Sequence, residues 1–300
     1  MSTVIRTSHS TNRTLHSCPR KILFEKELRL FPVNGSIAMR YGSGYHVGKE
    51  AYYKNDKNIL KAIEAVVEFW QKPTKQTFQE DYRNLESLIT SLTLYHEQYK
   101  DDGEIVIDTP EKKITTTILL TDKEKDCFGD MEVEFVVVID LILEVDSLKW
   151  VVDFKTTAVD LPYMASRMRK MAQLMGYQFT AQQNFTGING CMVYYHQLKA
   201  SKSRKTGLYG EMKTDFMKFP MIFSNQDYAD WRRYVIWGAY NLMKAKEAGY
   251  PPNFNSCYEF NRHCEYLPLC DYPRWDIDKF LQMDGFVVVP DEREAVIEPV

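Results

Sequence analysis

One run of apolar residues, VEFVVVIDLILEV at 133–145, constrains the fold of this chain more than any other stretch. It is rich in β-branched residues and almost continuously apolar, as strands are when both faces of a sheet are covered. A turn at Asp146–Ser147 and a second apolar run, LKWVVDFKTTA at 148–158, predict that the chain returns as the neighbouring strand. We therefore expect these two segments to form the centre of a sheet that helices cover on both sides.

Segments with helical periodicity lie before and after this sheet. A glycine-rich turn running into a helix is expected at 35–54. The other expected helices are 13–30, 58–72, a segment carrying Leu85 to Tyr99, 163–184 and 224–249. A strand, a turn and a second strand are expected over 103–120, and another strand at 190–199. The order predicts an α/β fold with a mixed central sheet flanked by helices. We expect a single domain over 1–300, with a mainly helical part at 1–102, a sheet core at 103–223, and a C-terminal helix with a cysteine cluster at 224–300.

Overall charge and hydropathy exclude several kinds of protein. The formal net charge is −3, so any nucleic-acid site must be a local basic patch. No run of 18 apolar residues occurs, so we expect no membrane helix. The first 18 residues lack the apolar segment of a secretory signal, which favours a cytoplasmic location where thiols stay reduced unless they bind metal.

Two aspartates on the central strands carry the chemistry. Asp140 interrupts the first apolar run, where an unpaired carboxylate is costly, and Asp153 follows on the returning strand. Carboxylates brought side by side usually hold a cation, and aspartate oxygens favour Mg²⁺ or Mn²⁺. Lys155 lies two residues after Asp153 and so shares its face, where it can orient a water or stabilise negative charge. The alternative is an ordinary ion pair at a strand end.

Three further side chains are candidates for the same site. His46 follows Gly42 and Gly44 at an expected helix start and can add a nitrogen ligand to the metal. Gln173 and Tyr177 are four residues apart and share one face of the helix after the second strand. They could contact the attacking water or a substrate phosphate. Each also has a purely structural interpretation.

Cysteines cluster near the C-terminus. Cys257, Cys264 and Cys270 follow the pattern C-x6-C-x5-C, and three thiols in a reducing compartment suggest a metal that needs a fourth ligand. Cys18, in HSCPRK, is the best fourth candidate, and an iron–sulfur cluster would take four such thiolates. Zinc with Cys3His coordination through His263 is the alternative.

Taken in order along the chain, these motifs resemble the RecB-like, iron–sulfur branch of the PD-(D/E)xK nucleases. The order is HSCPRK, the glycine-rich turn with His46, Asp140, Asp153-Phe154-Lys155, Gln173-x3-Tyr177 and the C-terminal cysteines. The branch includes the AddB nuclease domain, CRISPR-associated adaptation nucleases and phage exonucleases. The resemblance implies a restriction-endonuclease-like fold.

The resemblance also implies residue roles. His46, Asp140, Asp153 and the Phe154 carbonyl would bind a catalytic Mg²⁺ or Mn²⁺, Lys155 would position the attacking water, and Gln173 and Tyr177 would lie close to the DNA. A 4Fe–4S cluster held by the four cysteines Cys18, Cys257, Cys264 and Cys270 would join the two ends of the chain. The implied activity is metal-dependent exonuclease cleavage of DNA at single-stranded or frayed ends, in recombination, repair or end processing.

Two basic segments are candidates for contacting DNA, which binds through its phosphates. The first comprises Arg167, Arg169 and Lys170, and the second comprises Lys199, Lys202, Arg204 and Lys205. Tyr194, Tyr195 and Tyr209 near the second are candidates for stacking on unpaired bases.

The alternative function is a non-catalytic DNA-binding or adaptor subunit that retains a nuclease fold. A protein partner or a homo-oligomer also remains open.

Overall fold

The computed structural model describes residues 3–79, 81–108, 110–259, 262–270 and 285–289. Its centre is a mixed five-stranded sheet in the order β11-β10-β9-β8-β5. These strands are β5 (Ile105–Asp108), β8 (Leu141–Val145), β9 (Leu148–Thr157), β10 (Ile188–Lys199) and β11 (Lys213–Met221). β9 and β10 are parallel, and the other neighbours are antiparallel. The predicted α/β fold with a mixed sheet is confirmed.

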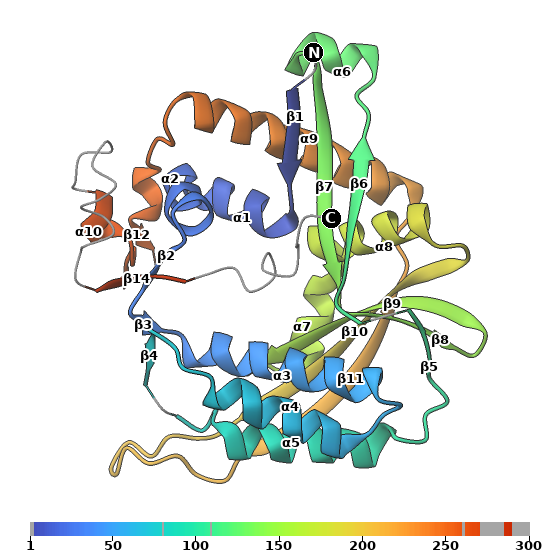
Figure 1. Cartoon of the computed structure of the whole chain (residues 1–300), viewed down its shortest axis with the longest axis vertical. Coiled ribbons are helices and arrows are strands. Elements are labelled where there is room, and N and C mark those ends of the chain that lie inside the picture. The colour runs from blue at the N-terminus through green and yellow to red at the C-terminus, as the bar shows by residue number, and fades with distance from the viewer. Residues whose placement is uncertain (1–2, 80, 109, 260–261, 271–284, 290–300) are drawn as a thin grey trace.

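Side chains of the central strand β9 alternate between two cores, as the pleat requires. Val152 and Phe154 face a core formed with α3 (Ile37–Lys54), α4 (Ile59–Gln71) and α5 (Leu85–Tyr99). Val151 faces the opposite core, formed with α8 (Ala172–Asn184) and α9 (Asn225–Glu247). Figure 1 shows α3, α4 and α5 stacked below the sheet, with α8 and α9 above.

A second, three-stranded sheet lies beside the first and was not expected. It has the order β1-β7-β6, from β1 (Thr3–Thr7), β7 (Met131–Ile139) and β6 (Lys112–Ile118). The apolar run at 133–145 is therefore two strands and not the single strand predicted, because β7 belongs to this sheet and β8 to the central one. Asp140 is the residue between them.

Two helix predictions differ from the structure. The segment 13–30 is broken into α1 (His9–Ser17), α2 (Pro19–Ile22) and a π-helical turn at Leu23–Glu27, because extended Cys18 interrupts the helix before Pro19. The segment 163–184 contains α7 (Leu161–Arg167), a short 3-10 turn at Met168–Lys170 and then α8. The remaining short elements of the described residues are α6 (Asp122–Phe128), α10 (Leu267–Cys270), a 3-10 turn at Phe254–Ser256, β2 (Leu30–Pro32), β3 (Asn34–Gly35), β4 (Thr77–Phe78), β12 (Tyr258–Glu259), β13 (Arg262–His263) and β14 (Phe286–Val288).

Glycines in α3 let this helix approach its neighbours closely, so they form no turn and no dinucleotide-binding loop. A Cβ atom on Gly48 would lie 2.6 Å from Leu92 Cδ1 and 2.8 Å from Val66 Cγ2. His46 is consequently in the middle of α3, and not at the helix start that the sequence suggested. Close packing of α3 on α4 and α5 fixes where that side chain points.

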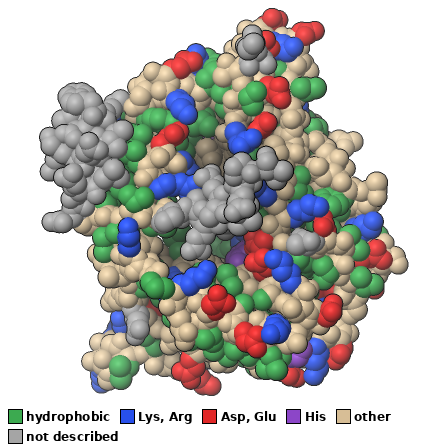
Figure 2. All heavy atoms as spheres, in the orientation of Figure 1, with side chains coloured by type: hydrophobic (Ala, Val, Ile, Leu, Met, Phe, Trp, Pro, Cys, Tyr) green, Lys and Arg blue, Asp and Glu red, His purple; other side chains and the backbone are tan. Residues whose placement is uncertain are grey.

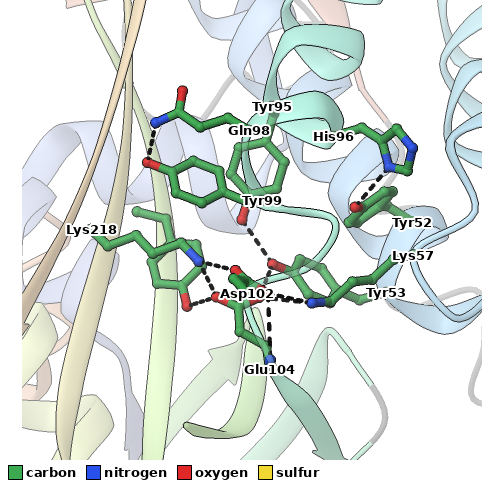
Figure 3. A network of polar contacts seen from close by, with 11 residues as sticks. Tyr52, Tyr53, Lys57, Tyr95, His96, Gln98, Tyr99, Asp102, Glu104 and Lys218 are labelled. Carbon is green, nitrogen blue, oxygen red and sulfur yellow. Dashed lines mark hydrogen bonds and ion pairs between the residues drawn. The ribbon is translucent and has the colours of Figure 1, made fainter.

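A buried polar network ties α3 to the edge strand β11 of the central sheet (Figure 3). The Glu104 carboxylate accepts hydrogen bonds from Tyr53 Oη at 2.7 Å, from Tyr194 Oη and from Lys218 Nζ. The Asp102 carboxylate accepts from Lys218 and Lys57. Because Tyr53 is on α3 and Lys218 on β11, the network holds the helix against the sheet. No helix in the described part of the chain is long and apolar enough to cross a membrane.

Candidate active site

Asp140 sits where the chain passes from one sheet to the other, and this position brings it to the central strand. The register of β8 with β9 pairs Leu141 with Val152, so one further step places Asp140 opposite Asp153. Asp140 Oδ2 accepts a hydrogen bond from the Phe154 backbone N–H at 2.7 Å. Asp140 is only 6% exposed. The predicted approach of the two aspartates is thus present, although Asp140 lies at a joint and not within a strand.

Asp153 and Lys155 share one face of β9, as their spacing predicted. Lys155 Nζ lies 2.7 Å from Asp153 Oδ1, which satisfies that oxygen. The second oxygen, Asp153 Oδ2, is buried and has no hydrogen-bond partner among the described residues. A buried carboxylate oxygen without a donor is costly, so its presence favours a cation at this point.

His46 and Glu111 complete the group from two other elements. His46 Nδ1 lies 3.3 Å from Asp140 Oδ2 and 3.6 Å from Glu111 Oε1. Glu111 adopts a left-handed conformation (φ 58°) in the turn between β5 and β6, and its N–H donates to the Asp140 carbonyl oxygen at 3.0 Å. The ligand atoms of His46, Glu111 and Asp140 all lie within 4.8 Å of one another. Within the described ranges, no other group of three or more His, Cys, Asp or Glu side chains does so.

Glu111 was missed by the sequence analysis. It stands in the turn PEK at 110–112, which looks like an ordinary polar connection. The signal that would have found it is the pairing of Lys112 with Ile139, which places this turn next to Asp140. That pairing was invisible because 133–145 was interpreted as one strand of one sheet.

Electrostatics in the group favour a bound cation. Burial, with the nearby Asp153 and Glu111 carboxylates, raises the pKa of Asp140 to about 7, although His46 and Lys155 oppose this. Burial works against a charged His46, but Asp140 and Glu111 outweigh it and raise the pKa of His46. Three carboxylates with only partial compensation form an anionic site, and the hard oxygen donors with one imidazole fit Mg²⁺ or Mn²⁺. Figure 2 shows histidine and acidic side chains together near the middle of the visible face.

Three neighbours of the group come from α8 and α1. Gln173 Nε2 donates to Tyr177 Oη at 2.9 Å, so the two predicted helix neighbours do contact each other. Burial, with Asp153 and Asp140 nearby, holds the pKa of Tyr177 well above its ordinary value, which keeps the hydroxyl protonated. His9, which the sequence gave no role, interacts electrostatically with Lys155 and Asp153. Burial, followed by Arg13 and Lys155, lowers the pKa of His9 to about 4.

The four cysteines of the predicted cluster line one cavity. Cys18 comes from the start of α2, and Cys257, Cys264 and Cys270 come from the C-terminal segment. The Asn253 N–H donates to Cys18 Sγ at 3.3 Å, across 235 residues of sequence. His263 does not line the cavity; it is exposed, and its ring packs on Tyr258 with centroids 4.8 Å apart.

The predicted DNA-contacting side chains divide into two groups. Tyr194 and Tyr195 are each only 2% exposed, so the prediction that they stack on bases is wrong. Their strand β10 is central and covered on both faces. Tyr209 is 38% exposed and remains a candidate. Lys202, Arg204 and Lys205 are exposed.

The chain is similar in sequence to one protein family and, more distantly, to solved structures. The sequence model of the PD-(D/E)XK nuclease superfamily matches residues 6–271. Among solved structures, a "Putative exonuclease" from Eubacterium rectale is 15% identical, with 88% of this chain and 86% of that chain covered and a TM-score of 0.47. The protein SSO0001 is 12% identical over 81% of this chain and 90% of that chain, with a TM-score of 0.28. No curated protein matches the sequence. Because the family match spans most of its length, this chain belongs to the PD-(D/E)XK nuclease superfamily.

Proposed function

We propose that the protein is a metal-dependent DNA exonuclease that hydrolyses phosphodiester bonds at single-stranded or frayed ends. The observation that carries the proposal is the convergence of Asp140, Glu111 and His46 beside Asp153 and Lys155. A divalent cation bound there would polarise the phosphate and lower the pKa of a water. The preference for ends rests on the resemblance of the ordered motifs to the RecB-like branch.

The side chains around this group have distinct proposed roles. Asp140, Asp153, Glu111 and His46, with the Phe154 carbonyl, would hold the cation. Lys155 Nζ is anchored by Asp153 at 2.7 Å, so it would orient the attacking water or stabilise charge that develops on the phosphate.

The Gln173–Tyr177 pair is held by its own hydrogen bond. The protonated Tyr177 hydroxyl would donate toward a phosphate oxygen, with Gln173 orienting it.

We further propose that Cys18, Cys257, Cys264 and Cys270 hold a 4Fe–4S cluster with a structural role. What supports this is that all four thiols line one cavity. A 4Fe–4S cluster takes four cysteine thiolates, and a zinc ion with the same four ligands is the alternative.

End-labelled and closed circular single-stranded DNA test the nuclease proposal directly. Wild-type protein with Mn²⁺ or Mg²⁺ should release label from linear strands, leave circles intact, and do neither in EDTA. Asp153→Ala should be inactive, whereas Asp126→Asn, on the exposed surface of α6, should match wild type. Cleavage of circles would overturn the exonuclease assignment. Inactive but folded wild-type protein that still binds DNA would favour the adaptor function.

The cluster is tested separately by anaerobic purification with iron and sulfide analysis. Wild type should carry about four irons and four sulfides and show visible absorption. Cys18→Ser should lose both, whereas Cys127→Ser, an exposed cysteine on α6, should retain them. Stoichiometric zinc in place of iron would contradict the cluster.

A further inference from the structure

The connection between β10 and β11 forms a hairpin that projects beyond the sheet (Figure 1). Lys202 and Tyr209 form a bridge across it, and two backbone hydrogen bonds hold its ends together, from Ser203 N–H to the Leu208 carbonyl and from Gly210 N–H to the Ser201 carbonyl, each at 2.8 Å. The hairpin therefore has a defined backbone, and all of 201–211 is exposed.

This hairpin concentrates positive charge on an otherwise acidic chain. Residues 199–213 hold five Lys or Arg residues and one Glu, a net +4, whereas the whole chain carries −3. Lys199 is paired with Asp160. Lys202, Arg204 and Lys205 form no ion pair with any described residue, so their charges are available to a polyanion.

Aromatic rings lie at the base of the hairpin next to these cations. Tyr209 packs on Tyr82 with ring centroids 5.2 Å apart, and Lys202 Nζ lies 5.2 Å from the Tyr209 centroid. The Arg83 guanidinium lies 4.5 Å from the Tyr82 ring and is ion-paired with Asp81 at 2.6 Å. Half-exposed rings interleaved with cations are the features with which proteins bind single strands, by stacking on bases and tracking the backbone.

The hairpin lies at the same end of the sheet as the candidate catalytic lysine. Lys155 on β9 pairs with Tyr195 on the parallel strand β10, and β10 then runs four residues further to Lys199. Strand rise of about 3.3 Å per residue puts the hairpin base about 13 Å past the site and its tip on the order of 30 Å away. At about 3.4 Å per stacked nucleotide, a strand of roughly ten nucleotides spans that distance.

We propose that this hairpin, with Tyr82 and Arg83 at its base, binds single-stranded DNA whose end lies in the candidate active site. The proposal rests on the proposed nuclease function and adds the path that the strand takes away from the site. Duplex DNA fits poorly, because its paired bases present no free faces to Tyr209.

Binding is measured first without cleavage, by fluorescence anisotropy in EDTA with oligothymidylate of about 16 nucleotides. Arg204→Glu/Lys205→Glu should weaken binding and reduce the slope of log K against log salt by about 1.4, for two lost phosphate contacts. Lys123→Glu/Lys125→Glu, on α6 at the opposite end of the molecule, changes net charge equally and should bind as wild type (Figure 1). Tyr209→Ala should weaken binding by about fivefold or more at unchanged salt slope.

Cleavage separates this proposal from the nuclease function. Arg204→Glu/Lys205→Glu should raise KM for the long strand and leave hydrolysis of oligomers of about four nucleotides unchanged, because at about 3.4 Å per nucleotide these are too short to reach the hairpin tip. The hairpin proposal would be overturned, even for an active enzyme, if both charge-reversal variants bound the single strand equally well. It would also be overturned if the hairpin variants lost as much affinity for blunt duplex DNA as for single-stranded DNA. Hairpin-dependent binding by a protein that cleaves nothing would leave the hairpin assignment standing and refute the nuclease function.

Discussion

Replacing Asp140 by Asn should stabilise the metal-free protein while it abolishes cleavage. The amide keeps the size of the side chain and can still accept the hydrogen bond from the Phe154 N–H. It removes a buried charge whose pKa rises from 3.8 to about 7 on folding. The difference of about three between these pKa values corresponds to about 4 kcal/mol of folding free energy above pH 7. For a chain of this length that is a rise in Tm of about 6 °C.

The sign of the pH dependence follows from the direction of the pKa change. A carboxyl with a raised folded pKa binds its proton more tightly in the folded state, so wild-type stability falls as pH rises from 3.8 to 7. The advantage of Asp140→Asn should therefore be about 4 kcal/mol at pH 8 and shrink to about 2 kcal/mol at pH 5. Denaturant unfolding in EDTA at both pH values measures it.

Divalent metal should reverse the ranking, because bound cation neutralises the carboxylates of wild type and the amide binds it weakly. Asp126→Asn, on the exposed surface of α6, is the control and should not change stability. The reasoning is refuted if Asp140→Asn in EDTA is no more stable than wild type at pH 8, or gains equally at pH 5 and pH 8.

Three further predictions concern separate parts of the molecule. Glu111→Gln should keep the fold, weaken Mn²⁺ binding by tenfold or more and lower the cleavage rate in parallel. Isothermal titration calorimetry measures the metal affinity, and an unchanged affinity would exclude Glu111 as a ligand. Although burial opposes it, hydrogen bonds from Lys218 and Lys57 lower the pKa of Asp102 to about 2, so this carboxylate stabilises the fold above pH 3.8 and loses that effect as pH falls toward 2. Asp102→Asn should cost about 1 kcal/mol at neutral pH after allowance for solvent screening, and the loss should vanish near pH 2 in urea titrations. Gly48→Ala should lower the free energy of unfolding by about 1–3 kcal/mol in chemical denaturation, although alanine has the better helix propensity, because the added Cβ would clash with buried Leu92. A more stable variant would show that this contact relaxes.

The parts of the fold that the sequence predicted are those where local periodicity and tertiary structure agree. α4 and α9 have clear apolar stripes and side-chain caps at Asn58 and Ser224, and both were expected within two residues of their bounds. The joint at Asp140 was missed because β-branched residues continue on either side of it, and local pattern does not report which sheet a strand joins. β1 was missed because five residues of mixed polarity signal a strand only through their pairing with β7.

The candidate site divides in the same way. Asp153 and Lys155 were placed correctly because the two-residue period of a strand is strictly geometric. Glu111 comes from a turn, and turns carry no periodicity from which a neighbour can be inferred. His9 likewise reaches the site through the docking of α1 onto α8 and α9, a contact between segments far apart in sequence.

The contacts of the N-terminal segment with residues much later in the sequence have a consequence for synthesis. β1 pairs with β7, whose residues follow about 130 positions later, and Cys18 meets Asn253 across 235 positions. At translation rates of about 5–20 residues per second, the N-terminal segment leaves the ribosome roughly 10–50 seconds before its last partner exists. During that interval Leu15 of α1 and Ile22 of α2 lack Ala245 and Tyr250, the residues that they pack against in the folded protein. Nascent chains shorter than about 250 residues should therefore be the ones that chaperones bind at this end, and release should follow the emergence of the segment that carries Asn253.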